Sequence, residues 1–311
     1  MEFFKKVTQF PFMGQRKVWY GLSSVLVVGS IVLTLMHGLN LGIDFTGGVV
    51  VEYNYSRSAD LEATRQSLHR AGFPDVAVQS FGTDRDVLVR LPPVPEGQKA
   101  QAITDRVTTA VKAVDGGAQL RRNEVVGAQV GQELVSKGLQ ALGITLVLIM
   151  LYVWMRFEWK FGVGAVLAAL HDPILVLGVF AATGMTFDLS VLAAILAVIG
   201  YSLNDTVVVF DRVRERFLSM RKSTPHEIMD VAINETLSRT VITSGTTLLT
   251  VIALFALGGE TLRGFSAALI VGIVVGTYSS IFVAAGLALD LGLTQEDLLP
   301  SEKKQAVDDL P

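Results

Sequence analysis

The sequence predicts an α-helical integral membrane protein with six transmembrane helices. One external α+β domain, ferredoxin-like in its β-α-β-β-α-β order, is expected between the first and second helices. Half of the 311 residues are hydrophobic and 18% are charged, whereas soluble domains average about 25% charged residues. Six apolar segments are long enough to cross a bilayer, which takes about 20 residues. Residues 49–137 differ, because 22 of these 89 residues are charged.

The composition excludes several other classes of protein. The long apolar segments exclude a disordered chain and an ordinary soluble enzyme with one core. A net charge of −3 speaks against a nucleic-acid partner bound through net positive charge. The chain has no cysteine, so it has no disulfide framework, thiolate metal site or catalytic thiol.

The predicted membrane elements follow in chain order. A basic N-terminal segment, 1–17, carries Phe3, Phe4, Phe10 and Phe12 and is expected to lie on the inner membrane surface. The first span, 18–39, lacks a small-residue cleavage site after it and is interpreted as a retained anchor. The other predicted spans are 138–155, 161–184, 189–210, 239–257 and 264–289. A basic loop or helix, 211–238, separates the fourth and fifth spans. A polar tail, 290–311, follows the sixth and is expected to be disordered from residue 295.

Lysine and arginine in the short connections predict the orientation. If the N-terminus is cytoplasmic, thirteen of these residues fall on the inner side, and only Arg263 falls in the two short outer loops. Cytoplasmic loops carry such an excess of positive charge. Both termini are therefore expected in the cytoplasm, and the large domain in the periplasm.

The external domain, 40–137, contains alternating and helical patterns. The predicted strands are 49–55, 76–83, 86–92 and 119–127, and the predicted helices are 59–72 and 98–114. Strands 76–83 and 86–92 would be joined by a turn at Gly82–Asp84. The order is that of the ferredoxin-like fold. We find no catalytic or metal-ligating set here, so the domain is interpreted as a binding or positioning module.

Polar residues inside the spans are the strongest candidates for function. Ionisable side chains cost at least about 2.5–3.5 kcal/mol at the bilayer centre on insertion scales, and they usually face the bundle interior. The third span contains His171 and Asp172, and the fourth contains Asn204, Asp205 and Thr206. The fifth begins at Arg239 and carries a run of hydroxyl residues: Thr243, Ser244, Thr246 and Thr247.

Asp205 and Arg239 are predicted to meet, because their spans are antiparallel neighbours joined on the inner side. Burial and a nearby guanidinium act in opposite directions on the protonation of a carboxylate. A small rearrangement could therefore bind or release a proton. The alternative is a static ion pair that holds the two spans together, and the residues alone leave both open.

Other features of the spans are interpreted as structural. His171 and Asp172 precede Pro173, and polar neighbours can satisfy the carbonyl group that a proline frees. Tyr201, Ser202 and Asn204 are interpreted as hydrogen-bond partners between helices. Two pairs of small residues, Gly272 with Gly276 and Gly164 with Ala168, predict close helix packing.

Three segments resemble a known family. They are GIDFTGG at 42–48, GYSLNDTVVVFDRVRE at 200–215 and LSRTVITSGTT at 237–247. Together they are similar to the SecF branch of the SecD/SecF family of bacterial protein export, within the resistance-nodulation-division superfamily. The resemblance covers nearly the whole chain. It implies a multi-pass protein of the cytoplasmic (inner) membrane that uses the proton motive force to promote late preprotein translocation.

The resemblance also implies partners. These are SecD, the SecYEG channel, accessory subunits such as YajC, the unfolded preprotein and the lipid bilayer. It implies no enzymatic activity, no metal and no cofactor, with protons as the coupling ion.

Residue roles follow from the same resemblance. Asp205 and Arg239 match the proton-coupling positions, and the matching motif turn consists of Gly42, Asp44, Gly47 and Gly48. The supporting polar residues are Asn204, Thr206, Thr243, Thr247, His171 and Asp172. The sequence departs from the family pattern at Pro173, where an aliphatic residue is expected, and at Ala128, where a proline is usual.

Two alternative functions belong to other classes. A non-transporting scaffold of the translocon would need Asp205 and Arg239 only as a structural tie. A small-molecule or lipid exporter of the same superfamily would need a second copy, because six spans are half of the usual body. An enzyme is the least favoured, since the glycines at 42–48 precede a strand and form no phosphate loop.

Overall fold

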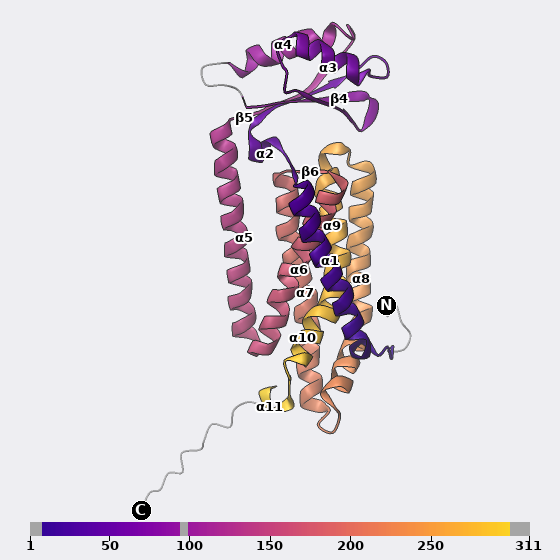
Figure 1. The fold of residues 1–311 in the computed structure, drawn as a ribbon. Helices are drawn as coiled ribbons and strands as arrows, with labels where there is room; N and C mark the ends of the chain where they lie inside the picture. Colours follow the sequence, from indigo (N-terminus) through magenta and orange to yellow (C-terminus); the bar gives the residue numbers. More distant parts are fainter. Residues whose placement is uncertain (1–7, 94–98, 299–311) are drawn as a thin grey trace, which may run out of the picture.

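The structure is a computed structural model that describes residues 8–93 and 99–298. Within these residues, six helical spans are long and apolar enough to cross a membrane. They run side by side, with a four-stranded sheet at one end (Figure 1). The spans are α1 (Phe12–His37), α5 (Ala128–Arg156), α6 (Trp159–Thr183), α7 (Leu189–Ser219), α8 (Pro225–Leu257) and a composite sixth span. That span consists of α9 (Glu260–Tyr278), the π-helix η1 (Ser279–Ala284) and α10 (Ala285–Asp290).

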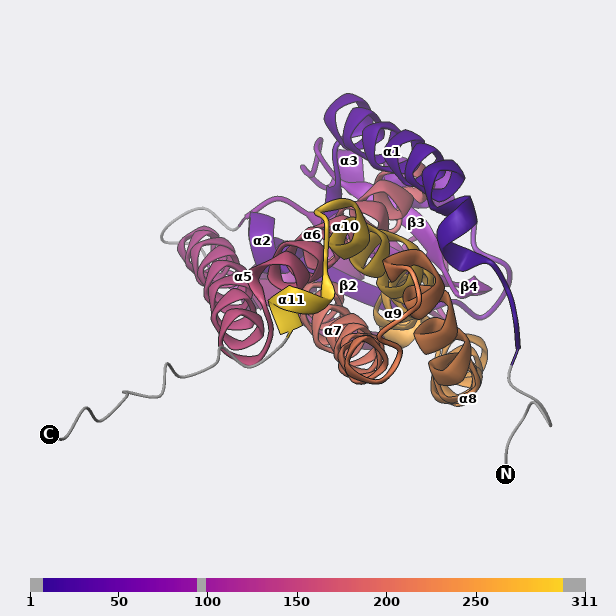
Figure 2. The same cartoon turned by 90° about the horizontal axis from the view of Figure 1, so that it is seen from below.

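Helix α6 and the span that contains α9 are the most buried, whereas α5 and α8 lie at opposite ends of the bundle and α1 lies along one side (Figure 2). Small residues allow the central helices to approach closely. A Cβ atom on Gly272 would lie 2.2 Å from Val198 Cγ2, and one on Gly276 would lie 2.9 Å from Ser202 Cβ. The predicted close packing is confirmed at these two glycines, which set the distance between α7 and α9.

Several helix ends differ from the expected boundaries. The predicted connection 211–238 is mostly a continuation of α7 and α8, and only residues 220–224 separate the two helices. Thr224 and Glu227 form a capping box there, with Pro225 in the first turn. Residues 128–137, assigned to the external domain, belong to α5, which begins after Gly127.

The α+β domain contains β2 (Gly48–Asn54), α3 (Leu61–Arg70), β3 (Ala77–Phe81), β4 (Thr83–Leu91), α4 (Ala100–Lys112) and β5 (Gln119–Val126). The strands are antiparallel neighbours in the order β3-β4-β2-β5. Both helices cover one face of the sheet (Figure 1). Alternate residues of β2, including Val51 and Tyr53, are fully buried under them with Leu68 and Val107, as the strand period of two requires.

The segment GIDFTGG joins this domain to the helices. It forms the short helix α2 (Ile43–Thr46), after which Gly47 and Gly48 have φ of 69° and 131° and turn the chain into β2. Just before it, β1 (Asn40–Leu41) pairs in parallel with β6 (Thr186–Phe187) in the α6–α7 connection. Asp44 Oδ2 accepts a hydrogen bond from Leu189 N, 3.0 Å away, at the start of α7. The sequence did not predict this pairing.

The start of α1 and the helix α11 lie at the end of the bundle away from the sheet (Figure 1). Helix α1 begins at Phe12, inside the segment expected to lie on the membrane surface. Residues 295–298, expected to be disordered, form the short helix α11 (Gln295–Leu298), because Lys160 Nζ pairs with Asp297 at 2.7 Å. Phe3, Phe4 and residues 299–311 lie outside the described residues.

Candidate functional site: a buried polar network

His171 and Asp172 form the centre of a polar network between the helices. Both are buried, with exposed fractions of 7% and 0%. His171 Nδ1 lies 2.9 Å from Asp172 Oδ1, and Ser202 Oγ on α7 donates to Asp172 Oδ2 at 2.5 Å. On the other side of the imidazole, Tyr278 OH on α9 lies 2.9 Å from Nε2. Ser23 Oγ on α1 lies 3.0 Å from the same tyrosine oxygen.

A second polar group surrounds Asp205, one helical turn after Ser202 on α7. Asp205 is 4% exposed, and its Oδ2 accepts a hydrogen bond from Ser244 Oγ on α8 at 3.4 Å. The Ser244 hydroxyl also lies 2.9 Å from Thr277 Oγ1 on α9 and 3.4 Å from Tyr201 OH. The predictions that Tyr201 and Ser202 bond between helices are therefore confirmed.

The two groups converge on α9. Gly276 packs against Ser202 and Asp172, Thr277 bonds with Ser244, and Tyr278 bonds with His171. Immediately afterwards, the helix widens into the π-helix η1, whose Ser279 and Ser280 are fully buried. Single π turns occur frequently at functional sites. Three consecutive residues of α9 therefore contact both groups.

The predicted ion pair between Asp205 and Arg239 is absent. None of the ion pairs among the described residues includes Arg239, whose side chain is exposed. The stripe that α8 buries contains Thr236, Thr240 and Ser244 at intervals of four. Arg239 precedes Thr240 by one residue, which rotates it by about 100° around a helix of 3.6 residues per turn. Ser244 is the α8 residue that contacts Asp205.

Asn204 also differs from its expected role as a hydrogen-bond partner between helices. It is exposed on α7, and its side chain forms no hydrogen bond with a described residue. The exposed face of α7 above it is made of small residues, Ala193, Ala197 and Gly200. A Cβ atom on Gly200 would meet no atom of a described residue within 4 Å. This face of α7, with its small residues and Asn204, is therefore not covered by the described residues.

The remaining predicted residues have local roles. Thr206 is buried and donates to Ser202 O at 3.1 Å. Thr243 donates to Arg239 O and Thr247 to Thr243 O, both at 2.9 Å, so these hydroxyls satisfy backbone carbonyls of α8. The motif turn lies in and beside α2, where the helices join the α+β domain, and Asp205 lies within α7. The turn consists of Gly42, Asp44, Gly47 and Gly48.

The network has the components of a proton relay. Hydrogen bonds connect Ser23, Tyr278, His171, Asp172 and Ser202 across α1, α9, α6 and α7. Imidazole and carboxylate groups can hold protons and pass them along such a chain. No lysine or arginine among the described residues forms an ion pair with Asp172 or Asp205, so the net charge of the cluster depends on the protons it holds.

Sequence reasoning missed Ser23, Thr277 and Tyr278. One signal was available for the last two, because residues 277–280 are four consecutive hydroxyl side chains inside an apolar span. Nothing in the sequence marks Ser23 among the other hydroxyls of α1. The His171–Asp172 pair was correctly noticed but was interpreted as support for Pro173, and α6 continues through that proline to Thr183.

Comparison with known proteins identifies the family of the chain. Residues 106–294 match the family described as protein export membrane protein SecD/SecF, C-terminal, and residues 32–59 match the SecD/SecF GG motif. The chain belongs to the SecD/SecF family. The matched regions contain the polar network except Ser23, and they contain the whole GIDFTGG segment.

Relatives and solved structures agree with the SecD/SecF assignment. The protein translocase subunit SecF of Pseudomonas aeruginosa is 47% identical over 98% of this chain and 99% of its own length. SecF of Vibrio alginolyticus is 48% identical over 94% of this chain and 92% of its own length. The crystal structure of SecDF from Thermus thermophilus matches 91% of this chain at 37% identity with a TM-score of 0.82. This chain spans 39% of that SecDF chain. The crystal structure of SecDF in the super-membrane-facing form matches 91% of this chain and 39% of its own, at 36% identity with a TM-score of 0.69.

Proposed function

We propose that this chain works with SecD in the Sec translocase and couples proton movement down the proton motive force to late preprotein translocation. The observation that carries this proposal is the buried network, in which two carboxylates and an imidazole lie inside the apolar helices. Ionisable groups at this depth mark ion and proton pathways in pumps and transporters. The six apolar helices and the SecF relatives support a multi-pass bacterial membrane protein.

The uncovered face of α7 and α8 is the surface proposed to meet SecD. It presents Ala197, Gly200 and Asn204 on α7 and Arg239 on α8, all exposed. Small residues let a partner helix approach closely, and an arginine inside a membrane needs a polar partner. SecD would then complete a polar site that contains the exposed Asn204 of α7 and Arg239 of α8, next to the buried Asp205.

The α+β domain is proposed to act on the preprotein in the periplasm. Its element order and its sheet order β3-β4-β2-β5 support a ferredoxin-like domain. A cleft of about 720 Å³ lies between the helix-free face of this sheet and the helix ends, and Arg90, Arg122 and Arg263 are among its lining residues. In this arrangement both termini are cytoplasmic in the inner membrane. SecYEG and accessory subunits such as YajC are the further partners, and protons are the coupling ion, with no enzymatic step or other cofactor.

Replacing Asp205 with asparagine tests the proposal, since asparagine keeps the size of the side chain and cannot titrate. We expect precursor export in cells to slow by at least about tenfold, equivalent to about 1.4 kcal/mol in the barrier. The membrane level of the variant and its co-purification with SecD should stay normal.

The exposed Asp75→Asn is the matched control and should export precursors at the wild-type rate. Wild-type export by Asp205→Asn, with the complex intact, would contradict proton coupling through this residue. It would favour the non-transporting scaffold instead.

A further inference from the structure

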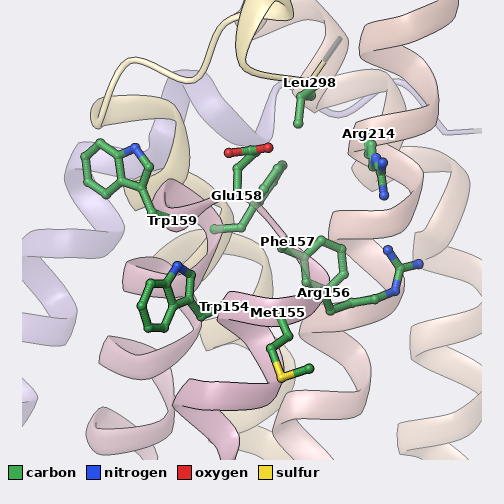
Figure 3. Close-up of a pocket in the computed structure, with 9 residues that line it drawn as sticks. Trp154, Met155, Arg156, Phe157, Glu158, Trp159, Arg214 and Leu298 are labelled. Atoms are coloured by element: carbon green, nitrogen blue, oxygen red, sulfur yellow. The ribbon is translucent and has the colours of Figure 1, made fainter. Parts of the chain in front are cut away.

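A cavity lies at the end of the bundle away from the sheet, where α5 passes into α6. Its volume is about 400 Å³, within the range of about 300–1,000 Å³ typical of small-molecule sites. Phe157 and Phe161 line it, and they pack with Phe210 at ring-centroid distances of 5.7 and 4.5 Å. Leu298 of α11 lines the opposite side (Figure 3).

Contacts within the chain hold the walls of this cavity in place. Helix α11 is held by the 2.7 Å ion pair between Lys160 and Asp297. It is also held by a hydrogen bond from Gln295 Nε2 to Phe217 O at 2.9 Å. Arg156 is paired with Asp211 at 2.5 Å, and its guanidinium lies over the Phe157 ring.

Two exposed residues of opposite charge line the cavity. Arg214 and Glu158 both line it, and neither forms an ion pair with a described residue. They come from different elements, Arg214 from α7 and Glu158 from the α5–α6 connection (Figure 3). A ligand that carries both an anionic and a cationic group complements this pair, whereas a ligand with one sign of charge leaves the other residue unpaired.

The cavity adjoins an apolar helix surface. Trp154 and Trp159 are 68% and 55% exposed and lie together on the side of the cavity away from Arg214 (Figure 3). Tryptophan is enriched where the bilayer meets water. Along α5, a stripe of exposed apolar side chains runs from the cavity toward the middle of the helix: Met155, Leu151, Leu148 and Ile144.

We propose that this cavity binds the headgroup of a phospholipid that carries a phosphate and a primary ammonium group, the phosphatidylethanolamine class. The phosphate would bind Arg214 and the ammonium would bind Glu158, with the acyl chains along the α5 stripe. A quaternary choline headgroup has no N–H to donate to Glu158. A headgroup with a phosphate alone leaves the carboxylate unpaired beside an anion.

Lipid retention by the purified complex with SecD tests this site. The complex is titrated in detergent with phosphatidylethanolamine, phosphatidylcholine or phosphatidylglycerol, and bound lipid is counted by native mass spectrometry. We expect phosphatidylethanolamine to bind about tenfold more tightly than the other two, the size of one charge-assisted hydrogen bond.

Two variants and a control separate the contributions. Arg214→Gln should weaken phosphatidylethanolamine binding about tenfold, and Glu158→Gln should remove its advantage over phosphatidylcholine. Arg221→Gln, an exposed basic residue of the α7–α8 turn outside the cavity, should change neither. Equal binding by wild type and Arg214→Gln, or tighter binding of phosphatidylglycerol than of phosphatidylethanolamine, would overturn the proposal.

Discussion

At the scale of single residues, Tyr278 is the junction on which the proposed relay depends. Its hydroxyl lies 3.0 Å from Ser23 Oγ and 2.9 Å from His171 Nε2, so it connects α1 to the imidazole. Its ring packs near Trp19, at 5.9 Å between centroids. The ring therefore contributes packing, and the hydroxyl contributes the hydrogen bonds.

Tyr278→Phe is expected to slow precursor export several-fold at a normal membrane level, because it removes the hydroxyl and keeps the ring. Tyr152→Phe is the matched control, since Tyr152 is 49% exposed on α5. Pulse-labelled precursor processing in cells measures both variants. Equal export by the two variants would show that no proton passes through this hydroxyl.

Asp115 gives the α+β domain a pH dependence that is independent of the membrane. The Ser56 hydroxyl and the Gly117 N–H donate to this carboxylate at 2.7 and 2.9 Å and hold the pKa of Asp115 below its usual range. A lowered folded pKa means that this contribution to stability is complete above the unfolded pKa of about 3.9. It is lost as the pH falls through the folded pKa.

Thermal unfolding of the purified chain at pH 6 and pH 3 measures this contribution. The unfolding temperature should fall more between pH 6 and pH 3 for wild type than for Asp115→Asn, because the asparagine cannot titrate. Asp75→Asn should behave like wild type. An identical loss in Asp115→Asn and wild type would rule out Asp115 as a source of the acid dependence.

The sequence predicted which polar residues are buried better than it predicted their contacts. Asp205, His171 and Asp172 are conspicuous, because an ionisable group within an apolar span is costly unless it faces the interior. Arg239 and Asn204 are equally conspicuous, yet both are exposed in this chain. Each lies one position away from a buried residue, and the sequence alone does not show which face of a helix its neighbours will cover.

At the scale of elements, Gly272 and Gly276 of α9 allow α7 and α9 to pack closely and bring together the polar groups around Asp172 and Asp205. Gly272 contacts Val198, and Gly276 contacts Ser202 one turn later. The closeness of the two backbones places Gly276 beside Ser202 and the Asp172 carboxylate, and Ser244 of α8 bonds to both Asp205 and Thr277. Because packed interiors have few voids, an added methyl group must be accommodated by movement.

Gly272→Ala is expected to destabilise the chain by about 1–3 kcal/mol, the usual cost of overpacking. The added Cβ would lie 2.2 Å from Val198 Cγ2. Adding Val198→Ala should restore much of the stability, because it removes the clashing methyl groups. Unfolding in denaturant, for both variants and for the single Val198→Ala, measures the coupling. No recovery in the double variant would mean that another contact sets the helix distance.

Some elements follow from local sequence and others need the tertiary structure. The strands of the α+β domain are predictable, since Val49, Val51 and Tyr53 alternate with partly exposed residues. The π-helix at Ser279–Ala284 and the pairing of Asn40–Leu41 with Thr186–Phe187 are not. Both depend on contacts between segments far apart in the chain, which periodicity does not report.

At the scale of the whole molecule, the uncovered face of α7 is the proposed contact with SecD. Gly200 lies in the middle of it with nothing near its position. Leucine is a better helix former than glycine, so a leucine there should not harm the folded chain itself. It would, however, occupy the space that a partner helix needs.

Gly200→Leu is expected to reduce co-purification with SecD by at least about tenfold, since a bulky side chain prevents close approach of a helix. Gly143→Leu is the matched control, because Gly143 is exposed on α5 and also has nothing within 4 Å. Both variants should reach the membrane at the wild-type level. Normal co-purification of Gly200→Leu would move the SecD interface to another face.

Proton flow through the purified complex distinguishes proton coupling through Asp205 from a scaffold role. The complex with SecD is reconstituted into vesicles containing a pH-sensitive dye, and a pH gradient with a membrane potential is imposed. We expect that the wild-type complex conducts protons and that Asp205→Asn, with the complex intact, loses this conduction. Equal proton flow in the wild type and in Asp205→Asn would contradict it.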